Sequence, residues 1–409
     1  MRRSWLLHGL LSVGLFLSPL ASAQKEKKSS SAFSEKPTNL KASIPPLTLV
    51  YLKRQHGDIA LRPFFDPLIP EEGIQGAELG INDNNTTGQF TGQSFDLKKV
   101  EIPLEDSLSE RFKTLLKEGH HLFLLDLSAE EQVTLALIPE ASEALLFNIA
   151  ASEDRLRGAD CRKNLLHIIP SHAMKADALA QYLGKKRWQK WFLVTQSQPE
   201  DLLYADAIRK SAKKFGAKVV ADKPWSHTFD ERRTPESDIP VFTQNTDYDV
   251  VVVIDTERMI SDLFPYRTWL PRPVVGTSGL VPSSWQYTHE AFGAQQLQNR
   301  FMAANGRPMR DKDYAAWLAV RAIGESATRT KSTELGSMKS FLLGTDFALG
   351  GFKGVPLSFR SWDQQLRQPL ILGAERGVVA IAPIEGYLHP TNELDTLGTD
   401  QPESTCRLH

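Results

Sequence analysis

Short apolar runs alternate with segments of helical spacing through most of the chain. The alternation predicts a doubly wound α/β fold, because runs that are apolar on both faces are typical of strands inside a parallel sheet. There are more runs than one open sheet of ordinary size holds, so two such lobes are expected. The runs begin at positions 47, 121, 144, 190, 218, 248 and 273. The helical segments are 107–119, 129–141, 171–187, 199–216, 257–270 and 313–329.

Two other stretches have patterns of their own. Residues 76–102 begin as a helix and end as a strand. Between the two we expect a polar turn that includes 83–87 and contains Gly88 and Gly92, with Gly80 upstream. Towards the end of the chain, 357–373 and 377–384 have the pattern of an antiparallel hairpin. The hairpin is expected to be a return excursion of the chain and not a third domain.

The first residues indicate export. Arg2 and Arg3 precede an apolar stretch that ends in the small residues Ala-Ser-Ala. This predicts a signal peptide at 1–23, cleaved near Ala23, with the general secretory and twin-arginine routes both open. Residues 24–46 are rich in Lys and Ser and poor in large apolar groups, so they are expected to form a flexible leader.

Composition narrows the class of protein. The chain has 409 residues, of which 41% are hydrophobic and 24% charged, with a formal net charge of −1. This balance is that of a globular protein and argues against a nucleic-acid binder, which would carry a strong basic excess. The two cysteines, Cys161 and Cys406, are an even pair in an exported chain, which favours a disulfide over two free thiols. Such a bond would tie the C-terminal tail, 391–409, to the middle of the chain.

Motifs for catalysis and metal binding are not found. The sequence has no P-loop, no G-x-S-x-G, no H-E-x-x-H and no C-x-x-C. The adjacent His120 and His121 are typical of surface residues at the start of a strand. We therefore expect no catalytic residue, no bound metal and no cofactor.

A resemblance to a known family runs through most of the predicted mature chain. The segment GAELGINDNNTTGQFTGQSFDLKKVEI (76–102) is similar to the first helix, turn and second strand of Leu/Ile/Val-binding, type 1 periplasmic binding proteins. The segments 170–220 and 313–330 are similar to the lobe-crossing segment and the late helix of that family. Within the family, RPVVGTSGLVPSSW (272–285), LSFRSWDQQLRQPL (357–370) and HPTNELDTLGTDQPESTC (389–406) resemble one subfamily. Its members are the ABC-transporter substrate-binding proteins associated with pyrroloquinoline-quinone (PQQ)-dependent alcohol dehydrogenase systems.

The resemblance implies a fold and a function without catalysis. Two α/β lobes joined by a three-crossover hinge would close over a small molecule linked to alcohol oxidation. The partner would be an ABC-transporter permease in the inner membrane, and the protein would be a periplasmic monomer. The alternatives are a ligand-sensing module for a membrane receptor and an accessory factor that handles the quinone. The implied division is 47–168 and 294–348 for lobe 1, and 169–293 and 349–390 for lobe 2.

The ligand is expected between the lobes, since open α/β sheets bind ligands in the crevice beyond the carboxyl ends of their strands. Helix capping is the alternative role for several of the residues in those positions. In related amino-acid-binding proteins an acidic residue faces the ligand ammonium at the position of Ser278, and its absence here disfavours a free α-amino acid. The predicted ligand-binding residues are Ser128, Ser152, Asp255, Glu257, Ser278 and Trp285.

Overall fold

The computed structural model describes residues 45–55, 69–225 and 234–408. The predicted signal peptide, and the predicted leader up to residue 44, lie outside the described residues. Within the described ranges, no helix is both long and apolar enough to cross a membrane.

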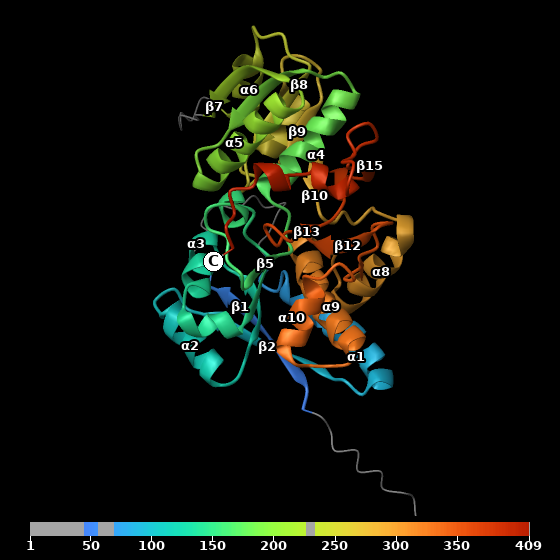
Figure 1. Ribbon diagram of the computed structural model, residues 1–409. Helices are drawn as coiled ribbons and strands as arrows, with labels where there is room; N and C mark the ends of the chain where they lie inside the picture. The colour runs from blue at the N-terminus through green and yellow to red at the C-terminus, as the bar shows by residue number, and fades with distance from the viewer. Residues whose placement is uncertain (1–44, 56–68, 226–233, 409) are drawn as a thin grey trace, which may run out of the picture. The chain divides into compact units, whose positions relative to one another are not determined.

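The first lobe is built on a five-stranded parallel sheet in the order β2-β1-β3-β4-β5 (Figure 1). Successive side chains of β1 enter different cores, because neighbours on a strand point to opposite faces. Leu49 and Tyr51 pack against α1 and α9, while Val50 and Leu52 pack against α2. The strands are β1 (Leu47–Arg54), β2 (Phe95–Ile102), β3 (Leu122–Asp126), β4 (Leu145–Asn148) and β5 (Leu165–His167). The helices are α1 (Ile74–Thr91), α2 (Leu108–Lys117), α3 (Ala129–Ala136), α8 (Ala294–Asn305), α9 (Asp311–Thr330) and α10 (Leu335–Leu342).

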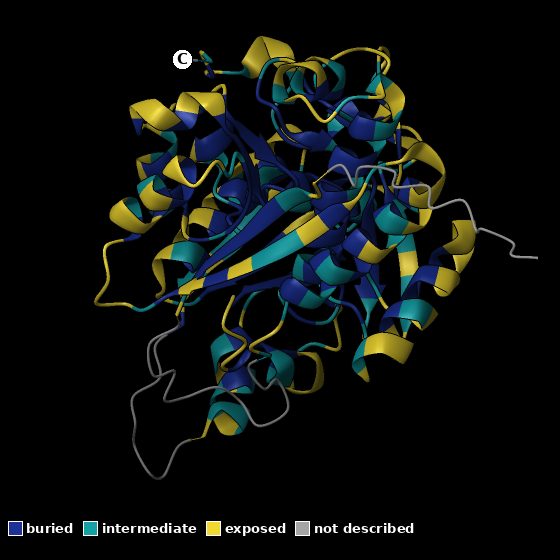
Figure 2. Cartoon of the chain, turned by 90° about the horizontal axis from the view of Figure 1, so that it is seen from below, coloured by how far each residue is buried: buried dark blue, intermediate teal, exposed yellow. Residues whose placement is uncertain are grey.

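The second lobe repeats the plan with a four-stranded parallel sheet in the order β7-β6-β8-β9. Trp191 and Leu193 of β6 pack against α4 and α5, and the alternate residues Phe192 and Val194 pack on the other face. The strands are β6 (Lys190–Thr195), β7 (Lys218–Pro224), β8 (Val250–Ile254) and β9 (Val274–Gly276). The helices are α4 (His172–Lys185), α5 (Pro199–Lys214), α6 (Pro235–Thr243) and α7 (Phe264–Arg267). Figure 2 shows buried residues along most strands and exposed residues on the outer faces of the helices.

Two small antiparallel sheets complete the described chain. One has the order β10-β14-β15 and contains the predicted hairpin of β14 and β15, while the other has the order β11-β12-β13. Their strands are β10 (Val281–Ser283), β11 (Leu349–Gly350), β12 (Pro356–Phe359), β13 (Leu366–Arg367), β14 (Leu370–Ala374) and β15 (Gly377–Ala382). The short 3₁₀ helices are η1 (Pro139–Glu143), η2 (Asp154–Arg157), η3 (Ser261–Leu263), η4 (Ala291–Gly293), η5 (Glu393–Thr396) and η6 (Gln401–Glu403).

The chain passes three times between the cores of the two lobes. The first passage lies between Ile169 and Met174, the second between Leu280 and Trp285, and the third between Leu366 and Leu370. Three passages are the connection expected of a three-crossover hinge. The residue ranges assigned to the lobes in the sequence analysis stay a prediction.

The tail is joined to the first lobe by a disulfide. Cys161 and Cys406 are bonded, with their Cα atoms 5.7 Å apart and a separation of 245 positions in the sequence. The even cysteine count points to this pairing, and both cysteines are buried.

Two predicted local structures are wrong. The polar residues 83–87 form no turn, because α1 continues to Thr91 and ends at Gly92, whose φ is +72°. Helix α9 provides the partners that keep this stretch helical: Trp317 Nε1 donates to Asp83 Oδ2 at 2.9 Å, and Asn84 Nδ2 donates to the Val320 carbonyl at 2.8 Å.

The helix predicted at 257–270 is also not formed. Turns follow β8, and only η3 and the four residues of α7 are helical. Arg258 has a φ of +56°, which a right-handed helix does not accept. The buried Asp255 carboxylate organises the turn instead, through hydrogen bonds from the backbone of Ile260 and Ser261.

Candidate functional site

Two of the predicted ligand-binding residues serve as local caps. Ser128 is exposed and caps α3. Its hydroxyl accepts a hydrogen bond from the Glu131 backbone amide, and the Glu131 carboxylate accepts one from the Ser128 backbone amide. Asp255 is 1% exposed, and its Oδ2 accepts from the backbone of Ile260 and Ser261 at 2.8 and 2.9 Å. These bonds are the capping alternative raised by the sequence, and they engage the Ser128 hydroxyl and Asp255 Oδ2. As ligand contacts, both residues stay predictions.

Glu257, Ser278 and Trp285 have three different surroundings. Glu257 is exposed, whereas Ser278 is buried and donates to Asp262 Oδ1 at 3.1 Å. Trp285 is 3% exposed in the core of the first lobe, stacked on Tyr314 with the ring centroids 4.7 Å apart. As ligand contacts, all three stay predictions.

Ser152 belongs to a contact between the two lobes. It follows β4 of the first lobe and is 5% exposed. Its backbone carbonyl accepts from the His172 backbone at 2.9 Å, and its hydroxyl accepts from Lys175 Nζ at 3.2 Å. Both partners lie in the first turn of α4, which is the first helix of the second lobe. The crossover that follows β5 therefore brings a serine of one lobe onto a lysine of the other.

Around Lys175 lies a layer of polar and aromatic side chains from α4 and α5. His172 Nε2 and Glu200 Oε1 are 2.8 Å apart, and the His172 ring stacks on Tyr204 at 4.9 Å. His172 and Lys175 are one turn apart on α4, and Glu200 and Tyr204 are one turn apart on α5, so each pair shares a helix face. His172 and Tyr204 are 2% and 4% exposed. Neither His172 Nδ1 nor the Tyr204 hydroxyl has a hydrogen-bond partner within the described ranges.

Asp311 contributes the facing charge from the first lobe. It is the first residue of α9, and its Oδ1 accepts from the Trp285 backbone at 2.8 Å. Burial raises the pKa of the Tyr204 hydroxyl, and the Asp311 carboxylate raises it further. Burial lowers the pKa of the Lys175 ammonium, while the carboxylates of Asp311 and Glu200 oppose that shift. A carboxylate of the first lobe thus acts on the pKa of two side chains of the second lobe.

The Glu200 carboxyl responds to the same neighbours. Burial would raise its pKa, but the hydrogen bond to His172 and the charges of His172, Lys175 and Arg157 lower it on balance. Glu200 is therefore ionised at neutral pH and holds the His172 ring in place. Glu200 lies in the first turn of α5, where a carboxylate also interacts favourably with the helix dipole.

A second buried amine lies on the first-lobe side of Asp311. Lys353 is 3% exposed, and its Nζ lies 5.1 Å from the Tyr314 ring centroid and 5.9 Å from that of Trp285. It donates to the Ser284 carbonyl. Burial lowers the pKa of Lys353 to about 7, and Asp311 opposes the shift.

Most of this cluster could not be identified from the sequence. Ser152 is predicted because it follows the carboxyl end of a strand, but Lys175, Tyr204 and Asp311 lie in the first or second turns of helices. The fold class alone could have pointed to them. In a doubly wound α/β fold, the helix that follows a strand begins beside the crevice at the carboxyl ends of the strands. As for metal ions, no group of three or more His, Cys, Asp or Glu side chains within the described chain could hold one.

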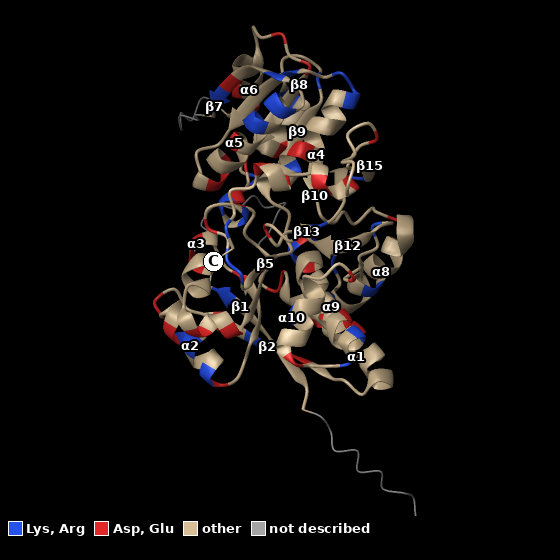
Figure 3. Cartoon of the chain, in the orientation of Figure 1, with Lys and Arg blue, Asp and Glu red and all other residues tan. Residues whose placement is uncertain are grey.

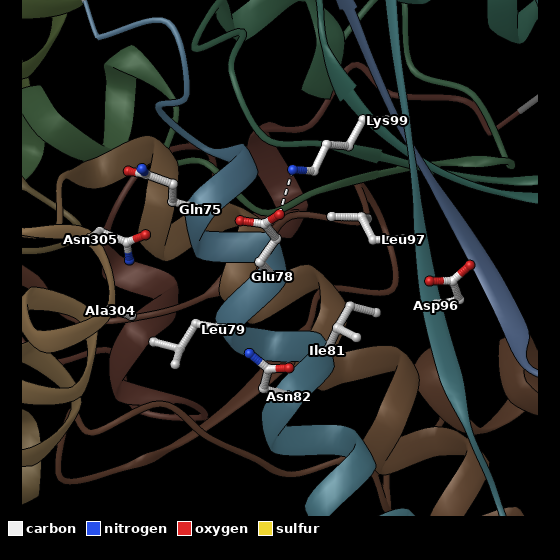
Figure 4. Close-up of a pocket in the computed structure, with 10 residues that line it drawn as sticks. All are labelled: Gln75, Glu78, Leu79, Ile81, Asn82, Asp96, Leu97, Lys99, Ala304 and Asn305. Atoms are coloured by element: carbon white, nitrogen blue, oxygen red, sulfur yellow. Dashed lines mark ion pairs between the residues drawn. The ribbon is translucent and has the colours of Figure 1, made fainter.

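Two cavities accompany these features. One, of about 410 Å³, adjoins the cluster at His172 and is otherwise lined by η2, α5 and the tail, including Asp154, Arg157 and Thr399. The other, of about 360 Å³, lies between α1, β2 and α8 (Figure 4). Glu78 and Lys99 pair across its edge, and none of the predicted ligand-binding residues lines it. On the helices of both lobes basic and acidic side chains are interspersed (Figure 3).

One family model matches part of the chain. Residues 72–228 match the family model described as periplasmic binding protein. No curated protein sequence matches the chain.

Solved structures share the fold over nearly their whole length. A periplasmic binding protein from Burkholderia mallei has a TM-score of 0.65 at 12% identity, covering 90% of this chain and 99% of its own. A branched-chain amino acid ABC transporter periplasmic ligand-binding protein from Burkholderia xenovorans has a TM-score of 0.67 at 14% identity, covering 88% and 99%. A solute-binding protein of an ABC transporter from R. palustris, in complex with benzoate, has a TM-score of 0.64 at 14% identity, covering 89% and 100%. The described chain thus has the two-lobed fold of type 1 periplasmic binding proteins, and residues 72–228 match the model of that family.

Proposed function

We propose that the protein is the periplasmic solute-binding protein of an ABC transporter and captures a small molecule between its two lobes. The observation that carries the proposal is the contact between Ser152 of the first lobe and Lys175 of the second, where the Asp311 carboxylate of the first lobe also acts to raise the pKa of Lys175 and Tyr204. Polar groups of two lobes that meet beside a three-crossover hinge can bind one ligand from both sides, and such binding favours the closed arrangement.

The similar structures support a small organic ligand. One is a branched-chain amino acid ABC transporter ligand-binding protein, and another is a solute-binding protein in complex with benzoate. For this chain we propose further that the ligand is linked to PQQ-dependent alcohol oxidation, on the resemblance of 272–285, 357–370 and 389–406 to the corresponding subfamily. Of the predicted ligand-binding residues, Ser152 is the one that we propose as a central ligand contact.

The partner that we propose is a permease in the inner membrane. The predicted signal peptide at 1–23 would place the protein in the periplasm, where a monomer could carry its ligand to that permease. Sensing by a receptor and a role in quinone handling would both use the same site between the lobes, and no contact among the described residues there favours either of them.

Mass spectrometry of small molecules released from natively purified protein tests the function. We expect one compound in near-stoichiometric amount, absent from protein unfolded and refolded before the measurement. Adding the compound back should raise the melting temperature and leave the compound chemically unchanged. Conversion of the compound by the pure protein would contradict the proposal and favour an enzyme.

A further inference from the structure

We propose that the C-terminal tail is a fourth connection between the two lobes and that it limits how far the lobes can open. The three passages of the hinge join the lobes through the backbone, whereas the tail is fastened to one lobe by side chains and to the other by the disulfide. This inference goes beyond the proposed function, because a connection of this kind restricts the lobes whatever the ligand is.

The middle of the tail is bound to the second lobe. Leu397 is fully buried in the core that α4 and α5 help to form. The Gly398 backbone amide donates to Asp177 Oδ2 of α4 at 2.9 Å. Lys214 Nζ of α5 donates to the same oxygen at 2.9 Å and to the Gly398 carbonyl at 3.0 Å. A Cβ atom at position 398 would lie 2.9 Å from Met174 Cγ, so the tail backbone itself packs against α4.

The end of the tail is bound to the first lobe. Cys406 is bonded to Cys161, which lies between η2 and β5, and the two residues are 6% and 1% exposed. Thr405 packs against the same part of the first lobe, since a Cβ atom at Gly158 would lie 3.0 Å from its Oγ1. The chain therefore leaves the second lobe at Gly398 and is covalently joined to the first lobe at Cys406. We call this span, 398–406, the tether.

The part of the tail that precedes the tether is held at the hinge. The Asp395 carboxylate accepts from Arg360 Nε at 3.0 Å and from Arg367 Nε at 2.7 Å. Arg367 lies in the third passage, between Leu366 of the first-lobe core and Leu370 of the second-lobe core. These contacts do not involve the disulfide. Loss of the disulfide should therefore release the tether from the first lobe without undocking the segment before it.

The tether runs beside an open space between the lobes. A cavity of about 410 Å³ lies there, and its lining includes η2 of the first lobe, α5 of the second, and Thr399, Glu403 and Thr405 of the tail. The tether therefore does not simply lie flat on one lobe. Its eight Cα–Cα steps can span at most about 29 Å when fully extended. This length is an upper limit on the separation of its two fastenings in any open form of the protein.

Small-angle X-ray scattering tests the tether, because a wider opening of the lobes raises the radius of gyration. The samples are protein that has been unfolded, freed of small molecules and refolded without reductant. One variant, Cys161→Ala/Cys406→Ala, removes the covalent fastening. The other inserts Gly-Ser-Gly-Ser-Gly-Ser between Glu403 and Ser404, which keeps both fastenings and adds up to about 20 Å of reach. We expect both variants to have a larger radius of gyration than the wild type.

A matched control separates tether length from added mass. The same six residues are added after the last residue of the chain, outside the loop that the disulfide closes. This control corrects for the scattering of the added residues and should show no wider opening. The insertion variant keeps its disulfide, which a thiol assay on denatured, unreduced protein verifies. It also provides the test if the double alanine variant does not fold.

Two outcomes would overturn the proposal. One is an equal radius of gyration for the wild type and both variants after correction by the control. The other is an increase confined to the double alanine variant, because the disulfide would then act through local packing and not through the length of the tether. The scattering measurement needs no ligand, so the tether can fail while solute binding stands. A protein that releases and binds no small molecule would contradict the proposed function and leave the tether unaffected.

Discussion

Trp285 shows how the surroundings of one side chain decide between a ligand contact and a core residue. Its ring stacks on Tyr314, its Nε1 donates to Gln298 Oε1 at 2.9 Å, and it is 3% exposed. Trp285→Ala should therefore lower the free energy of unfolding by about 3–5 kcal/mol, as large truncations in a core do. Urea denaturation measures this change, with Trp269→Ala as the control because Trp269 is 60% exposed. Unaltered stability with weakened ligand binding would instead make Trp285 a ligand contact.

Lys353 gives a residue-scale prediction that depends on pH. Its pKa is lowered by burial to about 7, while in the unfolded chain it returns to the ordinary lysine value of about 10.4. Between these two values the unfolded chain binds more protons than the folded protein, so stability should rise with pH. Below pH 7 both states are protonated, and the buried ammonium exerts its full destabilising effect.

The pH dependence of unfolding tests this assignment. The unfolding free energy of the wild type minus that of Lys353→Met should rise by a few kcal/mol from pH 6 to pH 9. The slope should be on the order of 1.4 kcal/mol per pH unit above pH 7. Urea titrations at pH 6, 7, 8 and 9 give both curves. Parallel curves over this range would show that Lys353 is not the titrating group.

At the scale of elements, local sequence patterns were enough to predict most strands but not the residues of the site. The run at 248–255 could only be a buried strand, because its valines are apolar on both faces, and β8 lies there. The helicity of Asp83 and Asn84 depends on α9, more than 230 residues later, and no local pattern reports such a contact. Ser152 and Lys175 likewise come into contact only because a crossover brings different lobes together. The fold was predictable because local patterns indicate its strands and helices. Most of the cluster was not, because it depends on long-range contacts of this kind.

The packing of α1 against α9 gives an element-scale prediction. A Cβ atom at Gly76 would overlap the backbone carbonyl of Asp313, and a backbone atom cannot turn away as a side chain can. Gly76→Ala should therefore destabilise the protein by about 1–3 kcal/mol, outweighing the gain of up to about 1 kcal/mol from replacing glycine in a helix. Gly350→Ala is the matched control, since no atom lies within 4 Å of its added Cβ. Equal melting temperatures for both variants would show that α1 and α9 are not in close contact.

At the scale of the whole molecule, the tail is held in two independent ways. The disulfide joins Cys406 to Cys161, while Asp395 accepts hydrogen bonds from Arg360 and Arg367 at 3.0 and 2.7 Å. All three side chains of the ionic contact are largely withdrawn from solvent. Loss of the disulfide should therefore leave the tail docked in the native state and act mainly on the unfolded chain.

Because the disulfide closes a loop of 245 residues, its removal should cost about 3–5 kcal/mol of unfolding free energy through the regained freedom of the unfolded chain. The double variant Cys161→Ala/Cys406→Ala tests this in urea, with the wild type measured in parallel with and without reductant. Hydrogen exchange at 394–400 should stay slow in the double variant, since Arg360 and Arg367 still bind Asp395. Fast exchange there in the native state would show that the disulfide itself positions the tail, and an unfolding free energy equal to that of the wild type would show that the bond adds no stability.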